Sequence, residues 1–113
     1  MMESKKHGVI GLFAALGDPT RFAVLETLMR EGERSAGELQ ELADISPPAM
    51  SRHLRVLREA NLVTRRIDGQ KRIYAAEPEA LRAIDGWALS HRGFWDAGLD
   101  RLAAALEARE RNG

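Results

Sequence analysis

Residues 35–61 of the sequence, SAGELQELADISPPAMSRHLRVLREAN, contain two helix starts in quick succession. The first is Ser35, which is followed three residues later by Glu38, the spacing of a capping box. The second is Ser46, a good helix cap, followed by Pro47, which is tolerated in a first helical turn. We expect two helices over about residues 35–60, separated by roughly three or four residues, as in a helix-turn-helix.

The second helix of this pair has a single apolar face. Met50, Leu54 and Leu57 recur at i, i+4 and i+7, so we expect them to form one buried stripe. Asn61 tolerates the left-handed conformation in which many helices end. With the stripe facing inward, the side chains that face outward are Pro48, Arg52, Arg55 and Glu59, flanked by Ala49 and Val56 on one side and Ser51 and Arg58 on the other.

Two more helices are expected upstream. Residues 8–16 carry apolar side chains at helical spacing, and Gly17 interrupts that pattern. Asp18 and Pro19 start the next helix, which we expect to end near Arg30. The side chains predicted to be buried are Phe22, Leu25, Leu28 and Met29 in this helix, and Leu39 and Leu42 in the short helix after Ser35.

The periodicity changes downstream. Residues 62–67 and 71–76 are short runs of β-favouring residues joined by Asp68-Gly69-Gln70, and Asp-Gly between such runs predicts a hairpin. From Pro78 to near Arg109 the pattern is helical, with positions that allow a kink or a break at Gly86, Gly93 and Gly98.

This order of elements is that of a winged helix domain. We expect one domain over residues 1–113, mainly α with a small β-hairpin (α+β). Its parts are a helix-turn-helix over 35–60, a wing hairpin over 62–76, and N- and C-terminal dimerisation helices over about 8–16 and 78–109. A single domain of this size has a limited interior, so leftover apolar surface favours pairing with a second copy.

Charge is unevenly distributed along the chain. The formal net charge is zero, but residues 46–72 hold seven basic side chains against two acidic ones, an excess of five positive charges. Such a split indicates a face that binds a polyanion on an otherwise acidic body. A solvated face without a partner is the alternative, and charge alone does not decide between them.

Composition excludes several classes of function. The chain has no cysteine, which removes disulfides, thiolate metal sites, thiol redox sensing and cysteine nucleophiles. No stretch is apolar enough for a membrane span and the start resembles no signal peptide, so we expect a cytoplasmic protein that does not contact membranes. No paired carboxylate, catalytic triad or phosphate-binding glycine loop is present, so we expect neither an enzyme nor a cofactor.

The outward side of the helix over about 47–60 is suited to the major groove of DNA. Arg52 is the expected base reader, because arginine can make a forked contact to guanine O6 and N7, and Pro48 and Ala49 can touch a thymine methyl. Phosphate contacts, which set register and affinity, are expected from Ser46, Ser51, Arg55 and Arg58. His53 flanks the buried stripe, where a packing role is at least as consistent with its position as a DNA contact.

The hairpin adds a second group of cations, which are Arg65, Arg66, Lys71 and Arg72. A basic two-stranded flap next to a basic helix can grip the DNA backbone or enter a minor groove. Charges on an edge strand also deter aggregation, and both roles can hold at once.

Three stretches in order resemble the ArsR family of bacterial winged-helix repressors. They are residues 16–21, 51–63 and 65–74, within a resemblance that spans roughly residues 8–107. It implies a homodimer with the first and last helices at the two-fold interface, recognition helices in successive major grooves, and repression at a palindromic operator. Asn61 departs from the family's usual glycine, and Pro47-Pro48 reduces the polar contacts that the start of the recognition helix can make.

The metal sites common in that family are not matched. Residues 39–44 carry no cysteine, and Asp85 is followed two residues later by Trp87 instead of histidine. His7, His53 and His91 are scattered along the chain, which does not predict a zinc site. We therefore expect no bound metal.

The C-terminal region carries a stripe of large apolar residues at helical spacing. Its expected role is a dimer interface formed by Leu12, Phe13, Leu16, Trp87, Phe94, Trp95, Leu99, Leu102 and Leu106. The alternative is a pocket between the tryptophans for an apolar small-molecule effector that the sequence does not identify.

Two classes of function are consistent with the sequence. The first is a sequence-specific, double-stranded-DNA-binding repressor that acts as a homodimer at a palindromic operator. The second is a winged-helix protein-interaction module whose basic face binds an acidic partner.

Overall fold

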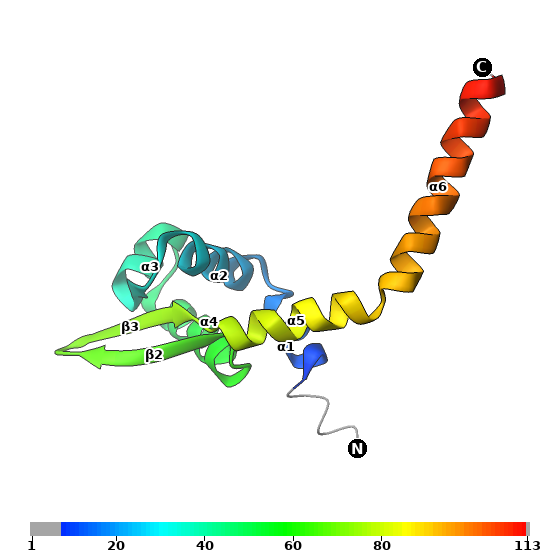
Figure 1. The fold of residues 1–113 in the computed structure, drawn as a ribbon. Coiled ribbons are helices and arrows are strands. Elements are labelled where there is room, and N and C mark those ends of the chain that lie inside the picture. The colour runs from blue at the N-terminus through cyan, green and yellow to red at the C-terminus, as the bar shows by residue number, and fades with distance from the viewer. Residues whose placement is uncertain (1–7, 113) are drawn as a thin grey trace.

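The computed structural model describes residues 8–112, and its elements follow the expected order with one added strand (Figure 1). The helices are α1 (Val9–Leu16), α2 (Pro19–Glu31), α3 (Ala36–Ala43), α4 (Pro47–Glu59), α5 (Pro78–Ser90) and α6 (Arg92–Asn112). The strands β1 (Arg34–Ser35), β2 (Val63–Asp68) and β3 (Lys71–Ala76) form an antiparallel sheet in the order β1-β3-β2. The expected fold class, a mainly helical winged helix-turn-helix with a small sheet, is confirmed.

The predicted helix starts are capped by the expected side chains. Asp18 accepts hydrogen bonds from the amides two and three residues further along α2, at 2.8 and 3.1 Å. Ser35 and Glu38 form the reciprocal capping box, with distances of 2.9 and 3.1 Å. The hydroxyl of Ser46 accepts from the amide of Ala49 at 3.3 Å. These bonds satisfy amides that have no partner inside the helices, which fixes where α2, α3 and α4 begin.

The core is built around the predicted stripe of α4. Met50, Leu54 and Leu57 are all buried, and the largest fully buried side chains are Leu39, Leu54, Leu57 and Leu62. Full burial of one such leucine contributes about 1.5–3 kcal/mol. Asn61 follows α4 with a φ of 60°, the left-handed conformation expected after a helix end. The chain can therefore turn sharply from α4 into the hairpin.

Three predictions of burial were wrong. Phe22, Met29 and Leu42 are 49%, 45% and 65% exposed. The buried side of α2 is formed by Val24, Leu25 and Leu28, and Phe22 and Met29 lie about 100° around the helix from it. Leu42 lies at the rim of a groove of about 240 Å³ between α2 and α3, where only Leu39 of α3 is buried.

The hairpin turn is shorter than expected. Asp68 pairs with Lys71, so the strands are joined by two residues, Gly69 and Gln70, and Asp68 itself is the last residue of β2. Gly69 has a φ of 63°, and Gln70 is not among the residues with positive φ. A positive φ at the first central position alone is the pattern of a type II′ turn, for which glycine is favoured.

The C-terminal helical region breaks in two, as the pattern allowed. The break lies at His91, between Ser90 at the end of α5 and Arg92 at the start of α6, and not at a glycine. Helix α6 extends away from the rest of the protein and has no buried residue (Figure 1). Among residues 8–112, no helix is both long and apolar enough to cross a membrane.

Candidate nucleic-acid interface

Helix α4 presents its basic side chains to solvent. Arg52 and Arg55 are exposed, and Arg58, near the end of the helix, is half-buried. At the start of the helix, Ser46, Pro48 and Ser51 are exposed and Ala49 is half-buried. This orientation follows from the burial of Met50, Leu54 and Leu57 on the opposite side. The structure therefore places the expected base reader, Arg52, on the free side of the helix.

The hairpin divides its four cations between two faces. Directly paired residues of antiparallel strands share a face. Arg65 pairs with Tyr74 and Ile67 with Arg72, whereas Arg66 pairs with Ile73 and Asp68 with Lys71. Arg65 and Arg72 therefore lie on the face next to α4, and Arg66 and Lys71 lie on the other face.

The side chains of α4 and of the nearer hairpin face meet in one recess. It has a volume of about 110 Å³ and is lined by Ser51, Arg55, Arg58, Arg65, Arg72 and Tyr74. No carboxylate of residues 8–112 forms an ion pair with any of these arginines, with Arg52 or with Lys71. Their positive charge is thus available to a partner.

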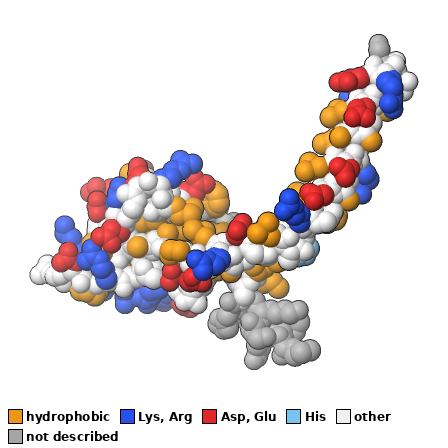
Figure 2. Space-filling view, in the orientation of Figure 1, with side chains coloured by type: hydrophobic (Ala, Val, Ile, Leu, Met, Phe, Trp, Pro, Cys, Tyr) orange, Lys and Arg blue, Asp and Glu red, His pale blue; other side chains and the backbone are white. Residues whose placement is uncertain are grey.

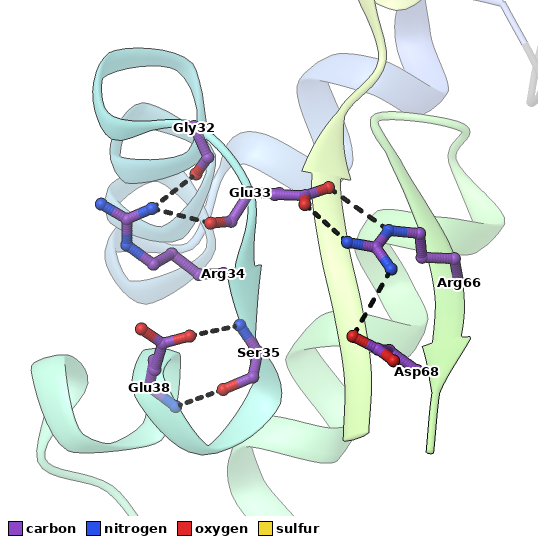
Figure 3. Close-up of polar contacts among 7 residues, drawn as sticks. All are labelled: Gly32, Glu33, Arg34, Ser35, Glu38, Arg66 and Asp68. Carbon is purple, nitrogen blue, oxygen red and sulfur yellow. Dashed lines mark hydrogen bonds and ion pairs between the residues drawn. The ribbon is translucent and has the colours of Figure 1, made fainter. Parts of the chain in front are cut away.

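Arg66 differs from the other cations of the hairpin (Figure 3). Its guanidinium donates to both carboxylate oxygens of Glu33, with Nη2 at 2.6 Å from Oε1, and Nη1 lies 3.9 Å from Asp68. The hydrogen bond from Arg66 holds the pKa of Glu33 below its ordinary value, and the same pair raises the pKa of Arg66. The expectation of a free Arg66 that contacts DNA is corrected: its guanidinium is held on the far face of the sheet.

Sequence reasoning missed the partner of Arg66. Glu33 precedes the short strand β1, which was not predicted, and β1 pairs with β3 through Ser35 and Ile73. In the register Ser35–Ile73–Arg66, β3 lies between β1 and β2, and the side chains of Glu33 and Arg66 meet across one face of β3. A two-residue strand is too short to give a periodic pattern, so the sequence did not indicate this pair.

His53 is turned toward α2. Its Nδ1 lies 3.3 Å from Nη1 of Arg21 and 3.8 Å from Oδ2 of Asp18. Amide hydrogen bonds at the start of α2, the largest from Arg21, lower the pKa of Asp18, with a smaller contribution from His53. Of the two expected roles for His53, this position supports packing over a direct DNA contact.

The terminal helices present a row of exposed apolar side chains. Phe13, Trp87, Phe94, Trp95, Leu99, Leu102 and Leu106 are 42% to 70% exposed, and Figure 2 shows such side chains along α6. Leu12 is only 5% exposed, so its assignment to a dimer interface is corrected, whereas Leu16 is half-buried beside the core and its assignment stays a prediction. They lie on the inward side of α1, whereas Ile10 and Phe13 lie outward.

The two tryptophans belong to different aromatic pairs. Trp87 packs edge-on against Phe13 with ring centroids 5.3 Å apart, and Trp95 packs against Phe94 at 6.3 Å. Within one protomer, these contacts do not support a pocket shared by both tryptophans. His7 lies outside the described residues, and within them no group of three His, Asp or Glu side chains is arranged to hold a metal ion.

Comparisons with known proteins agree with this geometry. Residues 16–66 match the family model described as a helix-turn-helix domain. The chain is 43% identical over 70 residues to an HTH-type transcriptional regulator of Mycobacterium tuberculosis, covering 62% of this chain and 64% of that protein, just under two thirds of its length. It is 33% identical over 79 residues to the transcriptional repressor SdpR of Bacillus subtilis, covering 70% of this chain and 87% of the repressor.

Solved structures show the same architecture. A protein described as an ArsR family transcriptional regulator matches with a TM-score of 0.71 at 32% identity, covering 78% of this chain and 90% of that one. NolR from Sinorhizobium fredii matches with a TM-score of 0.63 at 33% identity, covering 80% of this chain and 87% of NolR.

Proposed function

The chain belongs to the ArsR family of winged helix-turn-helix regulators, and we propose that it acts as a homodimeric repressor at a two-fold symmetric operator. Like the relatives and structural neighbours named above, it is a DNA-binding transcriptional regulator, and it is not an enzyme. The dimer, the operator symmetry and the roles of individual residues are the content of the proposal.

The observation that carries the proposal is the position of the free cations. Arg52 and Arg55 on α4 and Arg65 and Arg72 on the hairpin are exposed, form no ion pair within residues 8–112, and lie on adjoining surfaces. A helix of this width fits the major groove. The hairpin beside it is placed to reach the backbone or the neighbouring minor groove.

Each exposed residue of α4 has a proposed role. Arg52 reads a guanine, and Pro48 with Ala49 touches a thymine methyl near the start of the helix. Backbone phosphates are contacted by Ser46, Ser51, Arg55 and Arg58, and by Arg65, Lys71 and Arg72 of the hairpin. Arg66 is left out of this set because Glu33 occupies its guanidinium, and His53 because it faces Arg21.

A second copy of the chain is the proposed cover for the terminal helices. Monomeric proteins rarely expose a continuous apolar surface as long as the one on α5 and α6. A two-fold dimer through Phe13, Trp87 and α6 buries this surface and presents two α4 helices to one side of the DNA. Half-sites are then expected about one helical turn apart, or at a multiple of it.

The test is selection of bound fragments from random double-stranded DNA with the purified protein. We expect a palindromic sequence, a complex of two chains per site, and an affinity that falls steeply with salt. An intact dimer that retains no DNA at any sequence would contradict the proposal, and would favour the alternative in which the basic face binds an acidic protein.

A further inference from the structure

We propose that the recess between α4 and the hairpin is a site for a single phosphate group, and that its occupant is a backbone phosphate of the operator. The inference rests on the proposed function and adds to it: one phosphate per half-site is held from several directions at once. That phosphate lies between the groove that α4 enters and the groove that the hairpin reaches.

The shape of the recess fits a small anion. Its volume is about 110 Å³, and its walls come from three elements: α4, β2 and β3. The positions Ser51, Arg55 and Arg58 lie on consecutive turns along one side of α4. Arg65 and Arg72 lie opposite them, on the near face of the hairpin. An anion in the recess is therefore approached from both walls.

The chemistry of the lining side chains is that of an anion site. Four of the six are arginines, which offer hydrogen-bond donors and no acceptor, and the other two carry hydroxyl groups that can donate. Within the part of the chain that the structure describes, none of the four guanidinium groups is paired with a carboxylate. Four converging positive charges without a counter-ion repel one another, and a bound phosphate relieves that repulsion.

Tyr74 contributes a hydroxyl group to the recess. The residue as a whole is only 5% exposed, but its hydroxyl is not among the buried polar atoms and has no hydrogen-bond partner among residues 8–112, so it is open to the recess. The register of the sheet places Tyr74 directly beside Arg65, so a phosphate held by the arginines is within reach of this hydroxyl.

The far face of the same hairpin is arranged differently. There Arg66 is paired with Glu33 and Asp68, and Glu38 of α3 is close enough to Lys71 for the cation to lower the pKa of its carboxyl, after larger contributions from Ser35. Acidic side chains thus pair with Arg66 on that face, whereas Lys71 forms no ion pair within residues 8–112. The cations that line the recess remain free.

The experiment uses the full-length protein and the DNA fragment recovered by selection. Phosphates of one half-site are replaced one at a time by neutral methylphosphonates, and the affinity is measured for the wild type and for Arg65→Gln/Arg72→Gln. The control is Arg30→Gln/Arg82→Gln, which removes the same charge from exposed positions on α2 and α5. A second arm compares the melting temperature in inorganic phosphate with that in chloride at equal ionic strength, which reports binding of a free anion.

We expect one methylphosphonate position to weaken the wild type and the control about tenfold or more, and to leave the recess variant almost unchanged. We also expect the salt dependence of the recess variant to be lower by about one phosphate contact than that of the control. Thermal unfolding of each variant shows whether it is folded.

Each other outcome has a distinct meaning. Suppose that the wild type binds DNA, but no methylphosphonate position weakens it more than it weakens the recess variant. If inorganic phosphate also raises the melting temperatures of the wild type and the recess variant equally, the inference is overturned while the proposed function stands. If inorganic phosphate stabilises only the wild type and the control, and no methylphosphonate position distinguishes the wild type from the recess variant, the recess binds free phosphate. Its assignment to a phosphate of the DNA backbone is then wrong. If the wild type binds no DNA, the proposed function fails, and the melting temperatures alone decide whether the recess binds phosphate.

Discussion

His53, on the recognition helix α4, accepts a hydrogen bond from Arg21 at the start of α2, with Nδ1 and Nη1 3.3 Å apart. A guanidinium offers only donors, so Nδ1 of His53 is the acceptor in this contact. Arg21 also donates from Nε to the carbonyl oxygen of Ala15 at 2.5 Å. One arginine therefore joins the end of α1, the start of α2 and the recognition helix, and it adds a polar contact to the buried stripe that orients α4.

Replacement of His53 is expected to weaken DNA binding at all sequences, because α4 loses this contact and its orientation is less restricted. Asparagine has an acceptor oxygen close to the position of Nδ1, so His53→Asn should retain more affinity than His53→Ala. Titration of both variants against one operator and one unrelated fragment provides the measurement. Equal losses in the two variants would show that the hydrogen bond has no role in orientation.

The pair between Glu33 and Arg66 is expected to make stability dependent on acid pH. Arg66 lowers the pKa of Glu33 in the folded chain, so the unfolded chain binds a proton more readily than the folded one. The ion pair therefore stabilises the folded chain fully above about pH 4, the ordinary pKa range of a carboxyl group. This stabilisation is lost as the pH falls through the lower pKa that Glu33 has in the folded chain.

Urea unfolding of wild type and Glu33→Gln at several pH values tests this expectation. The difference in unfolding free energy should be constant at neutral pH and should vanish in acid. Arg66→Gln and the double variant should resemble Glu33→Gln, because each removes the same pair. A difference that persists below the folded pKa would assign the effect to packing.

Local chemistry made much of this fold predictable. Asp18, Ser35 and Ser46 cap helices whatever lies around them, and the spacing of Met50, Leu54 and Leu57 leaves α4 only one side to bury. The side that α2 buries was not predictable in the same way. Its apolar residues nearly surround the helix, and contact with α1, α3, α4 and β3 selects Val24, Leu25 and Leu28 over Phe22 and Met29.

The candidate site shows the same division. The free cations of α4 follow from its periodicity, but the fate of the hairpin cations depends on register. A shift of one residue exchanges the faces of Arg65 and Arg66, and the register here is set by a two-residue turn at Gly69. The pairing of Arg66 with Glu33 also depends on β1, which is too short to give a periodic pattern.

Leu57→Ala is expected to destabilise the protein by about 2–5 kcal/mol, because Leu57 is fully buried and its truncation leaves a cavity. Val56→Ala is the matched control on the same helix, since Val56 is exposed, and should cost about 1 kcal/mol or less. Denaturant unfolding gives both values. Similar losses for the two variants would contradict the burial pattern of α4.

Arg52→Ala is expected to relax sequence preference, whereas Arg55→Ala should weaken binding to all sequences by similar factors. Arg52 is the proposed reader of a guanine, and loss of such a contact reduces discrimination by about 1–3 kcal/mol. Arg55 is a proposed phosphate contact, which carries no sequence information. Affinities for operator variants changed at one base pair distinguish the two. An unchanged preference in Arg52→Ala would assign base recognition to another residue.

Helix α6 is expected to hold the dimer together through one seam. Trp95, Leu99, Leu102 and Leu106 follow one another at intervals of four, three and four residues, the spacing of a two-stranded coiled coil, and all four are exposed in the protomer. A carboxylate within a paired apolar seam is strongly unfavourable, so Leu102→Glu should convert the dimer to a monomer and abolish cooperative binding to a palindrome. Ala104→Glu adds the same charge about 170° around the helix from the seam and should leave the dimer intact.

Light scattering measures the mass of both variants. Because the monomer of Leu102→Glu retains a complete α4 and hairpin, it should still bind DNA weakly at low salt, and a monomeric mass for Ala104→Glu as well would place the interface elsewhere on α6.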